Sequence, residues 1–165
     1  MVIAIIGGGP AAVSLMFYFS LFASKLTGAT FLIFERRPVI GPGSPHGDPD
    51  PNLKVNMILA PHSVHPFDPA HFVHWLECHQ VNVSSDPVPR YWVGQYLADC
   101  FREAVDRLRS ASVQVRTIED EVVLLEHHDN QSLILKTRGG FSATADYVVL
   151  ALGHQKPRIP EEFVK

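Results

Sequence analysis

The sequence predicts an α/β fold with a parallel sheet at its core, and three observations lead to this class. The chain opens with an apolar run, residues 2–6, that enters a glycine turn and then an apolar segment of helical length, residues 11–23. A second apolar run, residues 30–35, ends in a carboxylate, and a third, residues 146–153, ends in small residues. Short apolar runs bounded by turn residues, with a helical segment between the first two, are typical of parallel strands joined by crossovers.

The glycine turn carries the first signal of function. Gly7, Gly9 and Ala12 occupy the small-residue positions of the G-x-G-x-x-G/A fingerprint. Gly7 permits the sharp turn, Gly9 lets a pyrophosphate approach the backbone, and Ala12 lets the helix pack close to the sheet. Pro10 suits a first helical turn, and the helix start around Ala11 offers free N–H groups to phosphates. This stretch therefore predicts a dinucleotide site.

The second strand, residues 30–35, ends at Glu35, somewhat beyond the usual distance of about 20 residues from the fingerprint. A carboxylate there can accept hydrogen bonds from both hydroxyls of a ribose; the alternative is a strand-end glutamate without a ligand. Arg36 and Arg37 could clamp a phosphate or the ribose phosphate of NADP. The alternative is a solvated strand end, which we favour for Arg37.

The middle of the chain combines an irregular excursion with two helices. The first helix should span residues 10–25, and the prolines between residues 38 and 89 predict a long excursion after the second strand. Within it, Gly41 and Gly43 fit a loop folded over a cofactor. A short helix should carry Phe72, Trp75 and Leu76 as core residues, and a longer one should span residues 93–109. Cys100 lies in the apolar stripe of the longer helix and is predicted to be a core cysteine.

His71, His74 and Cys78 lie at spacings of three and four residues on the short helix. Such spacing can hold zinc. Because no second ligand cluster is evident, we favour an exposed histidine-rich helix and predict no metal. The sequence also singles out no Ser-His-Asp or Cys-His set, so no catalytic residue is assigned.

The C-terminal third reads as strands. Residues 113–118 alternate, residues 121–126 and 132–138 flank a turn at Asp129-Asn130, and residues 146–153 form a buried strand. The complete prediction is a Rossmann-like fold with a parallel core sheet, an inserted helical excursion and a small antiparallel segment.

Composition narrows the class of protein. The chain has 165 residues and is 46% hydrophobic, which suits one globular domain, and its net charge of -3 gives no reason to expect nucleic acid. The two cysteines form no disulfide framework and favour a reducing, cytoplasmic setting. The apolar start lacks a positively charged n-region, and residues 11–23 are too short to span a bilayer, so a soluble protein is expected.

Three motifs, in this order, resemble the N-terminal part of a flavoprotein with two dinucleotide-binding domains. They are the glycine turn of residues 7–12, the strand end at Glu35, and the apolar strand that ends at residues 151–154. The chain most resembles the FAD–NAD(P)-binding family that includes amino-acid N-hydroxylating monooxygenase-like proteins. The supporting marks are Val55-Asn56-Met57, the helix with Trp75, and Pro89-Arg90 followed by Gly94-Gln95-Tyr96-Leu97.

The resemblance implies a role for particular residues. Around the FAD pyrophosphate it places Gly7, Gly9, Ala11 and Ala12, and at the closing edge of the site it places Ala151, Leu152 and Gly153. Glu35 is placed at the adenosine ribose, and Arg36 and the backbone of Val122 or Val123 are placed at the adenine. Asn56 and Met57 are placed near the flavin. Family members continue past the last of these motifs and carry a second glycine fingerprint for NAD(P)H, which this sequence lacks. The chain is thus expected to be a fragment or a short homologue.

Three functions stay open at this point. The resemblance implies the FAD-binding part of an NAD(P)H-dependent flavin oxidoreductase or monooxygenase. The alternatives are a non-catalytic nucleotide-binding or interaction module and an NAD(P)-dependent dehydrogenase domain. The partner is expected to be a nucleotide cofactor; the substrate is unknown, no membrane is expected, and the apolar strand at residues 147–152 could support self-association through an uncovered sheet surface.

Overall fold

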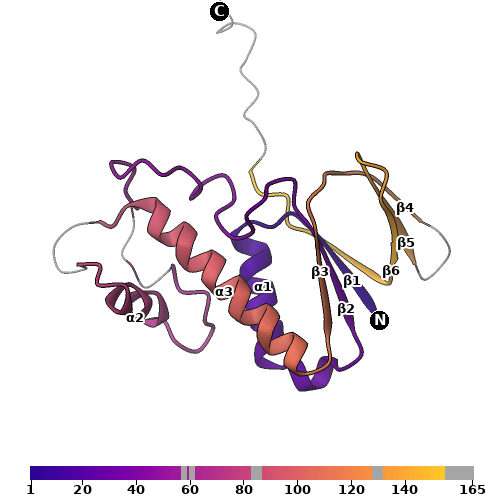
Figure 1. Ribbon diagram of the computed structural model, residues 1–165, viewed down its shortest axis with the longest axis horizontal. Coiled ribbons are helices and arrows are strands. Elements are labelled where there is room, and N and C mark those ends of the chain that lie inside the picture. The colour runs from indigo at the N-terminus through magenta and orange to yellow at the C-terminus, as the bar shows by residue number, and fades with distance from the viewer. Residues whose placement is uncertain (57–58, 60–61, 83–86, 128–131, 155–165) are drawn as a thin grey trace, which may run out of the picture.

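The structure is a computed structural model, and it describes residues 1–56, 59, 62–82, 87–127 and 132–154. Its core is a parallel sheet with the strand order β3-β2-β1-β7 (Figure 1). A smaller antiparallel sheet has the order β4-β5-β6. The strands are β1 (Val2–Ile6), β2 (Thr30–Phe34), β3 (Gln114–Ile118), β4 (Val122–His127), β5 (Leu133–Thr137), β6 (Ser142–Ala145) and β7 (Tyr147–Leu150).

Helices cover one face of the main sheet and the small sheet covers the other (Figure 1). Alternate residues of β1 divide between the two layers, as the pleat requires. Ile5 is buried with Phe17 on the helical side, whereas Ala4 is buried with Leu135 of β5 on the other. The helices are α1 (Pro10–Leu21), the 3₁₀ turn η1 (Ala23–Leu26), α2 (His71–Cys78) and α3 (Arg90–Ser110). The predicted Rossmann-like α/β fold, with its helical excursion and antiparallel segment, is confirmed.

The first helix is shorter than the predicted span of residues 10–25. It ends at Leu21, and the chain continues into the tighter turn η1. Ser20 Oγ donates a hydrogen bond to the Phe17 carbonyl, 2.7 Å away. A side chain that bonds back to the preceding turn competes with the helical ladder, which favours an early end. The long helix instead begins at Arg90, three residues before the predicted start, directly after Pro89.

The predicted buried strand at residues 146–153 is shorter in the structure, where β7 spans Tyr147–Leu150, and it is not buried, since Tyr147 and Leu150 are exposed. Asp146 separates β6, which the sequence did not predict, from β7. The Asp146 N–H donates to the Val2 carbonyl at 2.9 Å, and the Asp146 carboxylate accepts from the Val2 N–H at 2.6 Å. Asp146 therefore marks the point where the chain leaves the small sheet and joins the edge of the main one.

β7 is an edge strand of the described sheet, and the side chains at its two ends are open to solvent, whereas Val148 and Val149 pack partly buried against the two cores. Tyr147 is 61% exposed and Leu150 is 60% exposed. An apolar edge of this kind is a template for pairing with another chain. Self-association through this edge stays a prediction. Among the described residues, no helix is long and apolar enough to cross a membrane.

Candidate nucleotide-binding site

The glycine turn lies where the carboxyl ends of three parallel strands meet. The Gly7 N–H donates to the Phe34 carbonyl of β2 at 2.8 Å, and the Ala151 N–H donates to the Ile6 carbonyl of β1 at 2.8 Å. The chain after β1 crosses to β2 on one side, while β7 lies on the other side. Ligands of open α/β sheets bind at such a switch point, outside the carboxyl ends of the strands.

Two glycines of the turn are required by the protein itself. A Cβ on Gly7 would lie 2.2 Å from the Ala151 carbonyl oxygen, and Gly7 has a φ of +102°. A Cβ on Gly8 would lie 2.9 Å from Cβ of Glu35. Close packing at these two positions holds the turn against β2 and β7, and neither position has room for a side chain.

Gly9 differs from its neighbours because the space beside it is open. The nearest atom to a Cβ at Gly9 would be Cα of Gly43, 3.8 Å away, an ordinary contact distance. Gly9 is also the N-cap of α1, where no side chain caps the helix, and the first turn contains no acidic residue. The first-turn N–H groups of α1, at Ala11 and Ala12, therefore belong to a helix start that suits a phosphate. The residues present fit a pyrophosphate at this point.

Glu35 follows β2 directly and fixes the turn from the side. Its carboxylate accepts the Gly8 N–H at 2.8 Å and the Arg37 N–H at 3.0 Å. A carboxylate has about four lone-pair positions, so acceptor capacity is left for two hydroxyl donors. The predicted role at a ribose stays a prediction, but Glu35 also has a structural role that the sequence did not reveal.

Arg36 and Arg37 diverge after Glu35. Arg36 is exposed, as a residue beside an adenine could be. Arg37 is half-buried, and its guanidinium donates to Ser44 Oγ at 2.9 Å. Arg37 therefore remains partly solvated, as favoured, and in addition its side chain tethers the start of the excursion.

The excursion after β2 packs between the glycine turn and α3. The Gly41 N–H donates to the Gly8 carbonyl at 2.8 Å, and Cα of Gly43 is the atom nearest to the open space beside Gly9. On its other side, a Cβ on Gly41 would lie 2.7 Å from the Ala98 backbone nitrogen of α3. The close approach that Gly41 permits is thus made to a helix of the same chain.

Sequence reasoning missed a small cavity between the excursion and α3. It has a volume of about 190 Å³. Its lining residues are Val39, Pro42, His46, Gly47, Pro49, Tyr91, Gly94, Gln95 and Ala98. Within the described part of the chain, His46 Nδ1 is a buried atom without a hydrogen-bond partner. Burial lowers the pKa of His46, and the nearby His62 and Arg90 lower it further.

Of the remaining predicted site residues, one group lies beside the glycine turn and the others do not. Ala151, Leu152 and Gly153 follow β7 at the same edge of the sheet as the glycine turn. In β4 the register shifts between Val122 and Leu124, so Val123 falls outside the paired positions. Asn56 is exposed beside the bridge between Lys54 and Pro89. Met57 lies outside the described residues.

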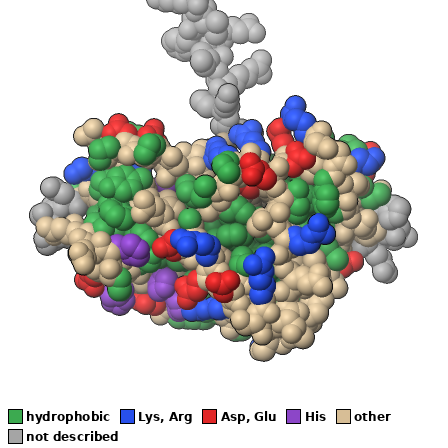
Figure 2. Space-filling view, viewed as in Figure 1, with side chains coloured by type: hydrophobic (Ala, Val, Ile, Leu, Met, Phe, Trp, Pro, Cys, Tyr) green, Lys and Arg blue, Asp and Glu red, His purple; other side chains and the backbone are tan. Residues whose placement is uncertain are grey.

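The exposed histidine-rich helix that the sequence suggested is found in part: His74 and Cys78 are exposed, whereas His71 is half-buried. His71 Nδ1 lies 2.8 Å from Tyr96 Oη, which also accepts the Val64 N–H at 3.0 Å. Histidine side chains gather on the side of the molecule where α2 lies (Figure 2). His74 is exposed beside Asp68, and Cys78 is an exposed free thiol, so the three candidate zinc ligands have different surroundings. In the described ranges no group of three potential ligands is placed to hold a metal.

Cys100 is buried in the stripe of α3, as predicted. Burial raises the pKa of its thiol to about 12, which disfavours the reactive thiolate. Cys100 is a core residue.

The fold and the glycine turn define a dinucleotide-binding domain of the Rossmann-like class. The chain belongs to the FAD-NAD(P)-binding family, whose sequence pattern matches residues 4–155. The resemblance drawn from the sequence motifs is confirmed. A search of curated proteins finds no match.

Several solved structures share the fold. S-allyl-L-cysteine S-oxygenase from Allium sativum is 23% identical, with a TM-score of 0.63, and the match covers 97% of this chain and 38% of that one. A steroid monooxygenase bound to NADP is 18% identical, with a TM-score of 0.60 and coverage of 96% and 28%. OTEMO in complex with FAD and NADP is 14% identical, with a TM-score of 0.58 and coverage of 96% and 26%. The chain therefore spans between about a quarter and two fifths of the length of these structures.

Proposed function

We propose that this chain is the FAD-binding portion of a flavin-dependent oxidoreductase of the monooxygenase type, with NAD(P)H as co-substrate of the complete protein. The observation that carries the proposal is the open space beside Gly9. Of the three glycines in the turn, Gly9 alone has room for a Cβ, and that room adjoins the uncapped start of α1. Family membership supports FAD as the occupant.

Each part of the site is proposed to contact a different part of the cofactor. The N–H groups at the start of α1, after Pro10, bind the pyrophosphate, and the missing Cβ of Gly9 lets it approach. Glu35 orients the adenosine ribose, with Arg36 and the backbone around Val122 and Val123 beside the adenine. The bound flavin supplies the redox chemistry, and the protein supplies its position and surroundings.

The flavin end of the site is proposed to lie beyond the pyrophosphate. Ala151, Leu152 and Gly153 form the closing edge next to the pyrophosphate, and Asn56 and Met57 are proposed to lie near the flavin ring. Residues that contact the substrate are unassigned. We propose a reducing, cytoplasmic setting because both cysteines are free thiols.

A titration with two nucleotides tests the proposal. FAD is added to the purified chain while flavin fluorescence is followed, and NADH is titrated separately. We expect FAD to bind at least about tenfold more tightly than NADH, which corresponds to about 1.4 kcal/mol. ADP should compete with FAD because it carries the adenosine and both phosphates, and FMN, which has one phosphate and no adenosine, should compete poorly. Tighter binding of NADH would favour the dehydrogenase alternative, and no binding of either nucleotide would favour an interaction module.

A further inference from the structure

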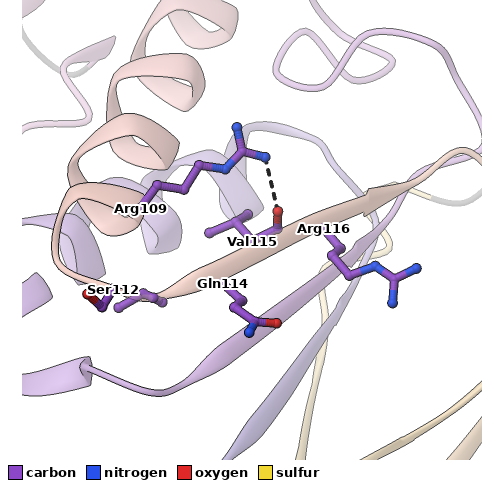
Figure 3. A pocket seen from close by; sticks show the side chains of 6 residues that line it. Arg109, Ser112, Gln114, Val115 and Arg116 are labelled. Atoms are coloured by element: carbon purple, nitrogen blue, oxygen red, sulfur yellow. Dashed lines mark hydrogen bonds between the residues drawn. The ribbon is translucent and has the colours of Figure 1, made fainter.

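A groove lies beside β3, at the end of the strand that is remote from the glycine turn. It has a volume of about 510 Å³ and lies between the last turn of α3 and the outer edge of the strand (Figure 3). The residues that line it are Arg109, Ser112, Val113, Gln114, Val115 and Arg116. Together these residues are called the β3 groove below. Among these described residues there are two arginines and no carboxylate.

The strand beside this groove has an open edge. β3 is the last strand of the described sheet and pairs only with β2 there. In a parallel pair, consecutive residues turn their backbone groups to opposite sides. The Gln114 N–H donates to the Ala29 carbonyl at 2.9 Å, and the Ile118 carbonyl accepts from Glu35 at 3.0 Å, so these two residues face β2. Val115 and Thr117 therefore present their N–H and C=O groups to the open edge.

One of these outward groups, the Val115 carbonyl, already accepts a hydrogen bond from a side chain. Arg109 extends from the end of α3 and donates to the Val115 carbonyl at 3.1 Å (Figure 3). An added strand would supply a backbone N–H at the same point. Arg109 is exposed, so its guanidinium can leave this carbonyl at small cost when a carboxylate replaces it as the acceptor.

The second arginine lies on the other side of the strand. Arg116 points away from α3, and its guanidinium lies 5.9 Å from the centre of the Phe141 ring. Arg109 and Arg116 thus flank the open edge from the two faces of the sheet. Neighbouring side chains of a strand also point to opposite faces. Two adjacent acidic residues in an added strand would therefore place one carboxylate near each arginine.

We propose that the β3 groove binds an extended acidic peptide segment of a partner protein, which adds to the main sheet alongside β3. Backbone hydrogen bonds to Val115 and Thr117 hold the segment, and the two arginines select for acidic side chains. This surface lies apart from the nucleotide site, and the inference does not depend on the proposed function.

The test uses a fluorescent peptide, Thr-Val-Thr-Glu-Glu-Thr-Val-Thr, and the full chain, with binding followed by anisotropy at low salt. We expect saturable binding. The double charge reversal Arg109→Glu with Arg116→Glu should weaken it at least about tenfold, whereas the matched surface variant Lys136→Glu on β5 should leave it unchanged. A peptide with lysines in place of the glutamates should show the reverse preference. Circular dichroism verifies that each variant is folded.

Three results would overturn the proposal. The first is equal binding of a peptide in which prolines replace the central threonines, because proline removes the backbone N–H that pairing needs. The second is that diglutamate competes as well as the peptide does. Binding would then depend on charge and not on pairing with the backbone of β3. The third is a dimer, detected by sedimentation and abolished by the double variant, that the peptide does not dissociate: the edge would then bind a second copy of this chain.

Discussion

Glu35 has a structural role and a proposed role in binding the nucleotide. Its carboxylate holds the backbone of the glycine turn through Gly8, and it is proposed to bind the adenosine ribose. Glu35→Ala should lower FAD affinity at least about tenfold, because charge-assisted hydrogen bonds to the ribose are lost. Fluorescence titration with FAD measures this change. The matched variant is Glu119→Ala, which removes an exposed acid that directly follows β3. Equal affinities for the two variants would remove Glu35 from the ribose site.

Gly7 is predicted to stabilise the fold itself, whether or not a nucleotide is bound. A Cβ there would collide with the Ala151 carbonyl, and the backbone already has a φ of +102°. Gly7→Ala should therefore reduce the free energy of unfolding by about 1–3 kcal/mol even without nucleotide. Denaturant midpoints measure this loss. Gly140→Ala is the control, since Gly140 also has a positive φ but has nothing within 4 Å of its Cβ position. A loss no larger than that of the control would mean that Ala151 yields to the added methyl group.

The contact between α2 and α3 is expected to make the stability of the fold depend on pH. His71 of α2 contacts Tyr96 of α3, and burial is the main reason that its pKa is lowered from 6.5. The neighbouring His65 and Arg107 lower the pKa further, while Glu103 and Asp68 oppose them. Below pH 6.5 the unfolded chain binds more protons at this residue than the folded chain does. Its contribution to stability is therefore present above that pH and is lost as pH falls.

Thermal melts at about pH 7.5 and 5.5 test this dependence. The wild-type chain should lose stability on acidification, and His71→Gln should lose less, because glutamine can still accept from Tyr96 but does not titrate in this range. Equal losses for the two proteins would assign the pH dependence to other groups.

Most elements of the fold could be predicted because their patterns are local. The glycine turn, the apolar strands and the stripe of α3 are each contained in one short segment. β6 could not be predicted, because Ser142 to Ala145 becomes a strand only by pairing with β5. The role of Arg37 was also hidden, since its partner Ser44 lies in an irregular loop. The half-buried position of His71 depends on Tyr96 of another helix, which the spacing of residues along α2 does not reveal.

The isolated chain is expected to bind FAD without catalysing the oxidation of NADH or NADPH. The sequence contains one glycine fingerprint, and hydride transfer to a flavin needs a second nucleotide held against it. The isolated chain, mixed with excess FAD and either NADH or NADPH, should show no sustained oxidation above a free-flavin control. Absorbance of the reduced nicotinamide follows the reaction. Clear turnover would mean that these 165 residues provide both nucleotide sites.

The space beside Gly9 is proposed to admit the FAD pyrophosphate. FAD titration of the wild-type chain and of Gly9→Val tests this placement, with circular dichroism and melting to compare their folds. The structure has room near the Gly9 Cβ position, with its nearest neighbour 3.8 Å away, so the variant should keep the fold. The valine side chain should fill the place of the phosphates and abolish FAD binding. If a folded Gly9→Val protein binds FAD with wild-type affinity, the pyrophosphate does not lie beside Gly9.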